Sequence, residues 1–276
     1  MHVSTLRSLL FAPAAEERKL RKALTAGADA VIADLEDGTA PGEKEAGRAI
    51  LEAVFAEDAP CARVVRLNAV DTPWFAGDLE LAARLQVDLL MLPKATPKAV
   101  AALGAAGPPV LAIVETAAGL RLAYETGSAD RVAALALGTH DLGAELRTTT
   151  LPGGLEFLYA RSKVVTDSAA AGLAAPIDTV YLDTRDTEGL EREATLARSL
   201  GFGGKLCIHP AQVETVNRVF TPSEEELEWA RRVLEAYRVA QRDGLGAVAL
   251  DGKMVDLPIV RQAERLLGGE ARGSDG

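Results

Sequence analysis

Eight short apolar segments of strand length lie between residues 6 and 210, and each but the last is followed by helical or helix-length sequence. The segments are Leu6–Ala12, Ala30–Asp37, Val64–Asn68, Asp88–Lys94, VLAIV before Glu115, VAALALGTH before Asp141, Ile177–Asp183 and Gly204–Pro210. Eight βα units in about 200 residues is the minimum length of a closed (β/α)8 barrel. An open doubly wound sheet usually has fewer strands and a glycine-rich first turn, whereas the first turn here reads FAPAAEE. We therefore predict an α/β chain that folds as a TIM barrel.

The pattern changes after Pro210, where the sequence no longer continues the barrel repeat. Three glutamates follow Ser223, which favours the start of a long helix extending to about Arg242. A short apolar run, AVAL, and a closing amphipathic helix come next. We predict a catalytic barrel over residues 1–220 and a C-terminal helical extension over residues 221–268 that packs on the barrel or on a neighbouring subunit. Residues 269–276 are expected to be disordered.

Charge and composition exclude several classes of protein. The formal net charge of −10 argues against a nucleic-acid partner, because such proteins normally present a basic face. No apolar segment reaches the roughly 20 residues of a membrane span, and no signal peptide precedes the first segment. Cys61 and Cys207 lack CxxC spacing, which is typical of reduced structural thiols. We expect a cytoplasmic protein without a membrane partner.

Two neighbouring apolar segments end in acidic residues, Glu115 and Asp141. A carboxylate at the end of a buried strand needs water, a hydrogen-bond donor or a cation, since an unpaired buried charge is costly. Two such groups at one edge of a sheet would form a hard oxygen site of the kind that Mg²⁺ prefers. The alternative, with equal weight from these segments alone, is that both carboxylates cap turns.

Cations and histidines also lie near the strand ends. Arg66 must find an anion, which is either the carboxylate of a ligand or a structural partner such as Glu36 or Asp37. Lys94 could form a Schiff base, but a salt bridge explains it equally well. His209 is expected to be a hydrogen-bonding rim or core residue, and His140 a bystander beside Asp141. These residues do not form a typical zinc site.

Nine phrases of the sequence together resemble one family. They are RSLLFAP, AVIADLEDGTAPGEK, VVRLN, LMLPK, AIVETAAGL, LGTHDL, YARSKVV, GKLCIHPAQ and GKMVDLP. The phrases are similar to the citrate lyase beta-subunit-like branch of the HpcH/HpaI aldolase superfamily, which also includes malyl-CoA and citramalyl-CoA lyases. The resemblance runs in uninterrupted order from residue 6 to about residue 265. It implies a TIM barrel with Mg²⁺ at the carboxyl rim.

The resemblance implies a role for each of five rim residues. Glu115 and Asp141 would be the Mg²⁺ ligands, and Arg66 would hold the carboxylate of a keto-acid fragment. Glu36 and Asp37 would contact the substrate side of the site and order metal-bound waters. These roles suit a retro-aldol cleavage, which needs a metal for the carbonyl that forms and a cation for the carboxylate.

Further roles follow from the same resemblance. Arg7 would contact the substrate near the first strand, and Arg18 and Lys22 would bind the CoA or acyl-carrier arm. Asp256, in the tail phrase, would be a general acid or base that reaches an adjacent subunit's site. One departure concerns Ala14, where the family commonly has a glycine that permits close backbone approach.

The predicted function is that of a Mg²⁺-dependent carbon–carbon lyase. It would cleave a 3-hydroxyacyl thioester of the citryl-, malyl- or citramalyl-CoA type into a keto acid and acetyl-CoA. The chain would act as a citrate lyase beta subunit with an acyl-carrier partner, or as a stand-alone homologue using free CoA. A homo-oligomer, trimeric or hexameric, is expected. The alternatives are an acyl-CoA thioesterase or malate-synthase-like condensing enzyme, and a non-catalytic structural barrel.

Overall fold

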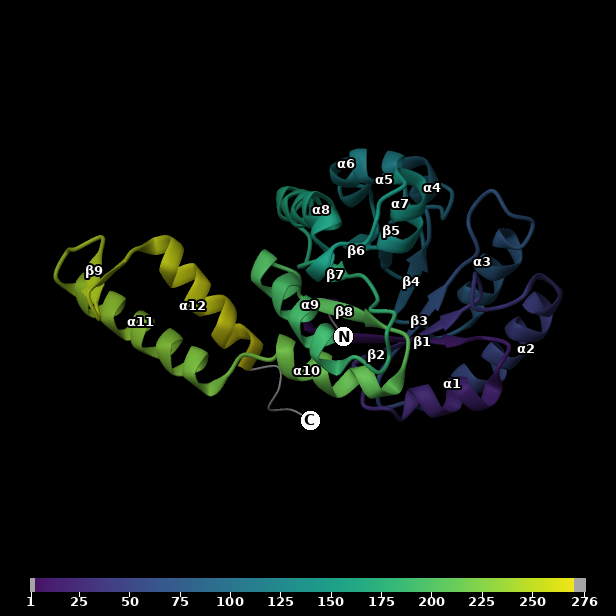
Figure 1. Ribbon diagram of the computed structural model, residues 1–276, viewed down its shortest axis with the longest axis horizontal. Helices are drawn as coiled ribbons and strands as arrows, with labels where there is room; N and C mark the ends of the chain where they lie inside the picture. The colour runs from purple at the N-terminus through teal and green to yellow at the C-terminus, as the bar shows by residue number, and fades with distance from the viewer. Residues whose placement is uncertain (1–2, 271–276) are drawn as a thin grey trace. The chain divides into compact units, whose positions relative to one another are not determined.

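The computed structural model describes residues 3–270 and contains a closed barrel of eight parallel strands (Figure 1). The strands are hydrogen-bonded in chain order, and β1 pairs with β8 to close the ring. They span Ser8–Pro13 (β1), Ala30–Asp34 (β2), Ala62–Arg66 (β3), Leu89–Leu92 (β4), Val110–Val114 (β5), Val132–Leu137 (β6), Ile177–Asp178 (β7) and Gly204–Cys207 (β8). The predicted TIM barrel is confirmed.

Helices surround the strands as the βα repeat requires (Figure 1). The barrel unit contains α1 (Glu17–Leu24), α2 (Lys44–Phe55), α3 (Phe75–Arg84), α4 (Pro97–Ala101), α5 (Ala117–Arg121), α6 (Ala123–Gly127), α7 (Thr139–Leu146), α8 (Leu158–Ala170), α9 (Thr187–Leu200) and α10 (Val213–Phe220). In the described part of this unit, four short 3₁₀ segments accompany them, namely η1 (Val3–Thr5), η2 (Pro41–Glu43), η3 (Pro152–Phe157) and η4 (Pro210–Gln212). Among residues 3–270, no helix has the length and apolar character that crossing a membrane requires.

The apolar side chains form two layers separated by the barrel wall. Leu9, Ile32, Val64 and Met91 belong to a cluster in the barrel interior, with Leu111, Ile113 and Leu206. The alternating positions, among them Leu10, Val31, Val65 and Leu90, pack between the strands and the helices. This alternation is the two-residue period of a strand. It fixes which residues at the strand ends face the barrel interior.

The seventh strand is shorter than predicted. β7 covers only Ile177–Asp178, whereas a strand was expected to extend to Asp183. The backbone carbonyl of Tyr181 accepts a hydrogen bond from the side chain of Gln212, and the Tyr181 hydroxyl donates to Asp186, the N-cap of α9. These side-chain contacts hold residues 179–183 as a loop at the rim.

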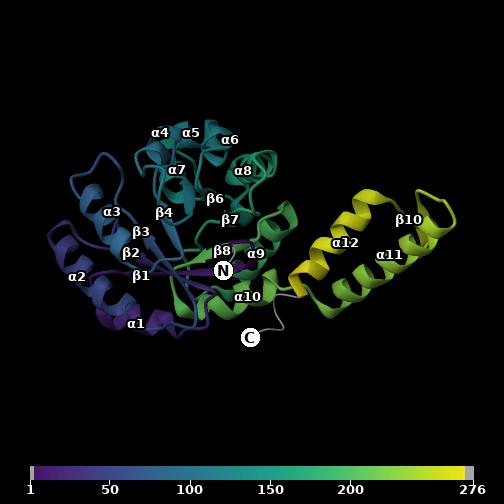
Figure 2. The ribbon, with the colours of Figure 1, turned by 180° about the vertical axis from the view of Figure 1, so that it is seen from behind.

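The chain divides into two compact units after Phe220. The second unit contains α11 (Glu224–Arg242), a hairpin of β9 (Val248–Leu250) with β10 (Lys253–Val255), and α12 (Leu257–Glu270). α11 and α12 lie side by side (Figure 2) and share a small apolar core. The Ser223 side chain accepts a hydrogen bond from Glu226 and the Glu226 carboxylate accepts one from Ser223, a capping box. The helix start predicted from the Ser-Glu-Glu-Glu sequence is therefore confirmed.

Candidate active site at the carboxyl rim of the barrel

The side chains at the carboxyl ends of the strands follow the inward alternation of the barrel interior. Continuing the inward positions of β2, β3 and β5 by one step reaches Asp34, Arg66 and Glu115. Active sites of TIM barrels lie at this end of the strands. The strand register therefore gathers these charged residues above an apolar interior.

Arg66 is held in place by an acid on the neighbouring strand. Its Nε and Nη2 donate to the two carboxylate oxygens of Asp34 at 2.7 and 2.6 Å, and its guanidinium lies 4.9 Å from the centre of the Phe11 ring. Asp34 also accepts hydrogen bonds from the backbone N–H groups of Glu36 and Gly38. A Cβ at Gly38 would lie only 2.3 Å from Asp34, so this approach requires glycine. Arg66 is fixed in a bidentate ion pair that leaves other N–H donors for a ligand.

Glu36 lies between two cations. Its Oε1 accepts from Lys94 Nζ at 3.2 Å, and Arg66 Nη1 lies 2.9 Å from its Oε2. The Arg66 contact is short but not aligned as a hydrogen bond, and Glu36 Oε2 is buried without a hydrogen-bond partner. Burial raises the pKa of Glu36, in opposition to Arg66. Its second oxygen retains acceptor capacity.

Lys94 is a salt-bridge partner rather than a free amine. Burial lowers its pKa, but Glu36, together with Asp37 and Glu115, holds the pKa above its usual value. A Schiff-base lysine needs the neutral amine as nucleophile. The geometry therefore favours the salt bridge over the imine among the two predicted alternatives for Lys94.

Glu115 is the most perturbed acid of the rim. It is 6% exposed, and its Oε1 accepts a hydrogen bond from the backbone N–H of Lys94 at 2.7 Å. Burial raises its pKa to about 7, partly offset by this hydrogen bond. A Cβ at Gly138, which follows β6, would lie 2.8 Å from Glu115 Oε2. The absent side chain at Gly138 leaves room beside the carboxylate.

Asp141, in the first turn of α7, completes a small cavity of about 130 Å³ at the rim. The cavity also borders the other predicted rim acid, Asp37, which is exposed. Its lining comprises Phe11, Asp37, Arg66, Ile113, Glu115, Gly138, His140, Asp141, Thr179, Val180 and Leu206. Glu115, Asp141, Arg66 and Asp37 thus face one space.

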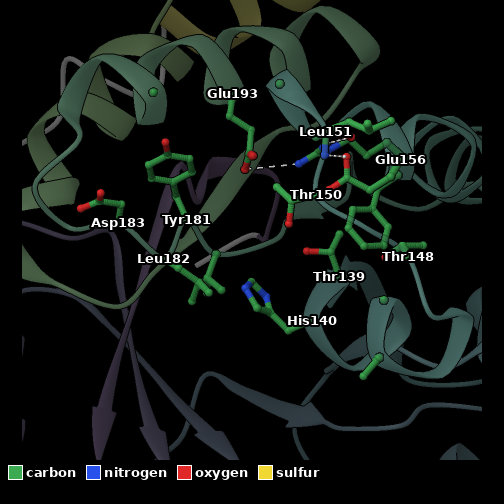
Figure 3. A pocket seen from close by; sticks show the side chains of 18 of the residues that line it. Thr139, His140, Thr148, Thr150, Leu151, Glu156, Tyr181, Leu182, Asp183 and Glu193 are labelled. Carbon is green, nitrogen blue, oxygen red and sulfur yellow. Dashed lines mark hydrogen bonds and ion pairs between the residues drawn. The ribbon is translucent and has the colours of Figure 1, made fainter.

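A larger groove of about 1040 Å³ adjoins this cavity, since His140 and Val180 line both. It lies between α7 with η3 and the loop that follows β7. Figure 3 shows the His140 ring between Leu182 and Thr139, facing the open middle of the groove. His140 was predicted to be a bystander, but its side chain lies where the two spaces meet. The Thr139 hydroxyl lies 2.9 Å from the Thr179 hydroxyl and joins the ends of β6 and β7.

The donor set fits a hard divalent cation. Glu115 and Asp141 line one cavity, burial disfavours the charge on Glu115, and a buried oxygen of Glu36 has no hydrogen-bond partner. Within residues 3–270, no group of three or more His, Cys, Asp or Glu side chains is arranged to hold a metal. Mg²⁺ usually keeps several waters and takes one or two protein carboxylates, which agrees with a pair.

Other predicted site residues lie elsewhere. Arg7 precedes β1, and its side chain and backbone N–H donate to Asp29, which precedes β2. These positions are at the amino ends of the strands, so the structure does not bring Arg7, predicted to contact the substrate, to the carboxyl rim. Arg18 and Lys22 are exposed on α1. Asp256 lies between β10 and α12 in the second unit.

Several contributors were not identified from the sequence. Asp34 is the main partner of Arg66, in addition to Glu36, which was one of the predicted alternatives. The strand-end position of Asp34 in AVIADLED could have indicated it. Lys44 Nζ is buried and donates to the carbonyls of Leu35 and Glu36 and to Asn68 Oδ1, which fixes the loop after β2. No sequence signal distinguished this lysine.

His209 behaves as predicted: its Nδ1 accepts from the backbone N–H of Ala211. Cys61 and Cys207 are both free and buried.

Comparison with known proteins agrees with this fold. Residues 7–210 match the model of the HpcH/HpaI aldolase/citrate lyase family. The chain belongs to this family. Residues 159–265 also match a family described as a C–C bond lyase of the TIM-barrel fold. Membership supports a lyase.

Named relatives cover nearly the whole chain. The citrate lyase subunit beta of Leuconostoc mesenteroides subsp. cremoris is 35% identical, over 95% of this chain and 92% of the relative. A (3S)-malyl-CoA thioesterase of Cereibacter sphaeroides is 39% identical, over 96% and 95%. The crystal structure of CitE from Mycobacterium tuberculosis, in complex with magnesium, acetoacetate and coenzyme A, is similar with a TM-score of 0.84 and 37% identity. It covers 98% of this chain and 100% of that one.

Proposed function

We propose that this protein is a Mg²⁺-dependent carbon–carbon lyase that cleaves a 3-hydroxyacyl thioester into a keto acid and acetyl-CoA. The observation that carries the proposal is that Glu115, Asp141 and Arg66 line one rim cavity. Carboxylates for a hard cation and a guanidinium for a substrate carboxylate are the parts such a cleavage needs. The magnesium and coenzyme A in the CitE structure support the same ligands here.

The chain's own groups divide the work of the reaction. Glu115 and Asp141 would hold Mg²⁺, which when bound supplies Lewis-acid stabilisation to the oxygen that becomes the carbonyl. Arg66, oriented by Asp34, would bind the carboxylate of the keto-acid half with its remaining donors. Glu36 and Asp37 would order water at this side of the site.

Protons must also move. Cleavage removes the proton of the 3-hydroxyl, breaks the C2–C3 bond and leaves a thioester enolate, which takes up a proton at C2 to give acetyl-CoA. We assign the role of general acid or base in these proton transfers to Asp256, acting either in the site of the same subunit or in that of an adjacent subunit. A shared site would require a homo-oligomer, for which we propose a trimer or hexamer. Arg18 and Lys22 are the candidate contacts for the phosphates of the CoA arm, because both cations are exposed on α1.

A thioesterase is the second candidate, because a relative of 39% identity is named a (3S)-malyl-CoA thioesterase. The two reactions differ in their products. A lyase releases a keto acid and acetyl-CoA, whereas a thioesterase releases the hydroxy acid and free CoA thiol.

A substrate panel separates these functions. Citryl-, malyl- and citramalyl-CoA are incubated with and without Mg²⁺, and the keto acid, acetyl-CoA and free thiol are measured. We expect keto acid and acetyl-CoA only with Mg²⁺, and a loss of about 10³-fold in kcat for Glu115→Ala and Asp141→Ala. Free thiol without keto acid would establish the thioesterase. Unchanged turnover in both variants would overturn the metal-dependent proposal.

The role of Asp256 has a test of its own. Asp256→Ala and Arg66→Ala chains are each expected to be inactive, and the two are mixed under conditions that exchange subunits. If sites are shared between subunits, random exchange restores about a quarter of the wild-type sites. No recovery, although mass spectrometry shows mixed oligomers, would assign Asp256 to its own subunit or to no catalytic role.

A further inference from the structure

We propose that Lys94 is a positioning residue that links Glu115 to Glu36, and that its ammonium sets how tightly the rim binds a divalent cation. This inference rests on the proposed function, because it concerns the same carboxylates. It adds a residue that contacts both carboxylates through different atoms.

The backbone of Lys94 has an unusual conformation. Its φ is 49°, in the left-handed region that residues other than glycine rarely adopt. Lys94 follows Pro93 at the end of β4, and its N–H donates to Glu115 Oε1 at 2.7 Å. The next N–H, of Ala95, donates to the carbonyl of Ile113 in β5. The left-handed residue thus lets two successive N–H groups meet the end of β5, one of them on the candidate metal ligand.

The side chain of Lys94 reaches in another direction. Its Nζ donates to Glu36 Oε1 at 3.2 Å, while Arg66 holds the opposite side of the same carboxylate. Lys94 therefore connects acids that follow β2 and β5, two strands that are not neighbours in the barrel. Backbone strain of this kind persists where the surroundings determine it, and it concentrates at functional sites.

The local charge balance gives Lys94 a measurable effect. The rim gathers five carboxylates, of Asp34, Glu36, Asp37, Glu115 and Asp141, against the cations Arg66 and Lys94 and the buried Lys44 behind the loop after β2. An ammonium bound to Glu36 repels a dication held by Glu115 and keeps Glu36 from becoming a further ligand. If Lys94 had only a structural role, its removal would leave Mg²⁺ affinity unchanged. A half-exposed ion pair also contributes little to the free energy of unfolding.

The experiment separates the ammonium from the backbone. Lys94→Gly removes the ammonium but accepts the left-handed φ and keeps the N–H that binds Glu115. Lys94→Val removes the ammonium and, being β-branched, disfavours that φ. Lys98→Met, on α4, removes an exposed lysine nearby and is the matched control. Mg²⁺ binding to metal-free protein is measured by calorimetry, together with the melting temperature and kcat.

We expect Lys94→Gly to melt no lower than wild type and to bind Mg²⁺ about 5-fold more tightly or better, with kcat reduced about 10-fold. Lys94→Val should bind Mg²⁺ more weakly than Lys94→Gly, because the N–H no longer orients Glu115. Lys98→Met should match wild type in all three measurements. Unchanged or weaker Mg²⁺ binding in Lys94→Gly overturns the inference. If wild-type protein binds no Mg²⁺, it is the proposed function that fails.

Discussion

Two clusters of charged side chains lie on opposite faces of the barrel wall and differ in how completely they are satisfied. The rim cluster, Asp34, Glu36, Arg66 and Lys94, lies at the carboxyl ends of the strands. The wall cluster, Arg161, Asp178, Glu193 and Lys205, joins β7 and β8 to α8 and α9. By the strand alternation, Arg66 faces inward, whereas Asp178 and Lys205 face outward, towards the helices.

The wall cluster is closed. Lys205 Nζ donates to Asp178 at 2.7 Å and to Glu193 at 2.6 Å, and Arg161 Nε donates to Asp178 at 3.0 Å. Arg161, Asp178 and Lys205 are each at most 1% exposed. Burial would raise the pKa of Asp178, but Lys205 and Arg161 lower it below its usual value. The cations and carboxylates satisfy one another, although Arg161 and Glu193 also line the larger groove.

The rim cluster is open by comparison. Glu36 Oε2 is buried without a hydrogen-bond partner, and the adjacent Glu115 has its pKa raised to about 7 by burial. Glu36 already has Arg66 and Lys94 beside it, but a bound cation would stabilise the charged form of Glu115, whereas the acids of the wall cluster are paired with Arg161 and Lys205. An unpaired carboxylate oxygen and an acid with a raised pKa therefore distinguish the rim from the wall cluster, in which cations hold each acid.

The largest expected effect comes from breaking the wall cluster. Asp178→Asn removes the acid shared by Lys205 and Arg161, so we expect a loss of about 3–5 kcal/mol in the free energy of unfolding. Urea unfolding measures it. The control Glu191→Gln, in an exposed ion pair with Arg218, should cost less than about 1 kcal/mol. A loss as small for Asp178→Asn would show that the wall cluster is not the tight network described.

The next effect concerns the rim and depends on pH. The folded pKa of Glu115, about 7, is above its ordinary value of 4.5, so the folded state binds more protons between these values. The metal-free protein should therefore lose stability as pH rises from 4.5 to above 7. Glu115→Gln lacks this loss and should be more stable than wild type at pH 8, by up to about 3 kcal/mol, and equal to it near pH 4.

Unfolding in urea with a chelator at several pH values tests this sign. Saturating Mg²⁺ should raise the stability of wild type but not of Glu115→Gln. If Glu115→Gln is the less stable protein at pH 8 without metal, the protein stabilises the charged carboxylate of Glu115 as it does that of Asp178. That result would contradict the stated difference between the rim and wall clusters.

The smallest effect distinguishes Arg7 from the cations of α1. Arg7 and Asp29 form a partly exposed ion pair at the amino ends of the strands, so Arg7→Ala should lose about 1 kcal/mol of stability and keep its KM for the thioester. Arg18→Ala should show the reverse, with unchanged stability and a KM raised several-fold if the cation contacts CoA phosphates. Raised KM in Arg7→Ala would return that residue to the substrate site.

Much of the barrel could be predicted because buried strands leave apolar runs bounded by charged ends. The same runs located Glu115, Asp141 and Arg66, because the carboxyl ends of all parallel strands of a barrel lie at one rim. Glu36 and Asp37 also lie there, although only Asp37 is among the residues that line the cavity. The resemblance gave Arg7 a substrate contact near the first strand but did not state which end of that strand it occupies, and the structure places it at the amino end.

Other features depended on contacts between distant residues. The end of β7 is set by side-chain bonds of Tyr181 with Asp186 and Gln212, which the run IDTVYLD does not reveal. The wall cluster depends on outward positions of two very short strands. The role of Lys94 depends on a left-handed φ, and a lysine gives no sequence signal of it. The place of Asp256 relative to the rim stays a prediction from family resemblance.

The most direct test of the difference between the clusters is a calorimetric titration of metal-free protein with Mg²⁺. Wild type is expected to bind one Mg²⁺ per chain, and Glu115→Gln and Asp141→Asn are each expected to lose that binding. Asp183→Asn, which removes another exposed carboxylate after β7, should bind as wild type does. Binding that survives in both Glu115→Gln and Asp141→Asn, or that is lost in Asp183→Asn, would contradict the assignment of the open rim carboxylates as the metal site.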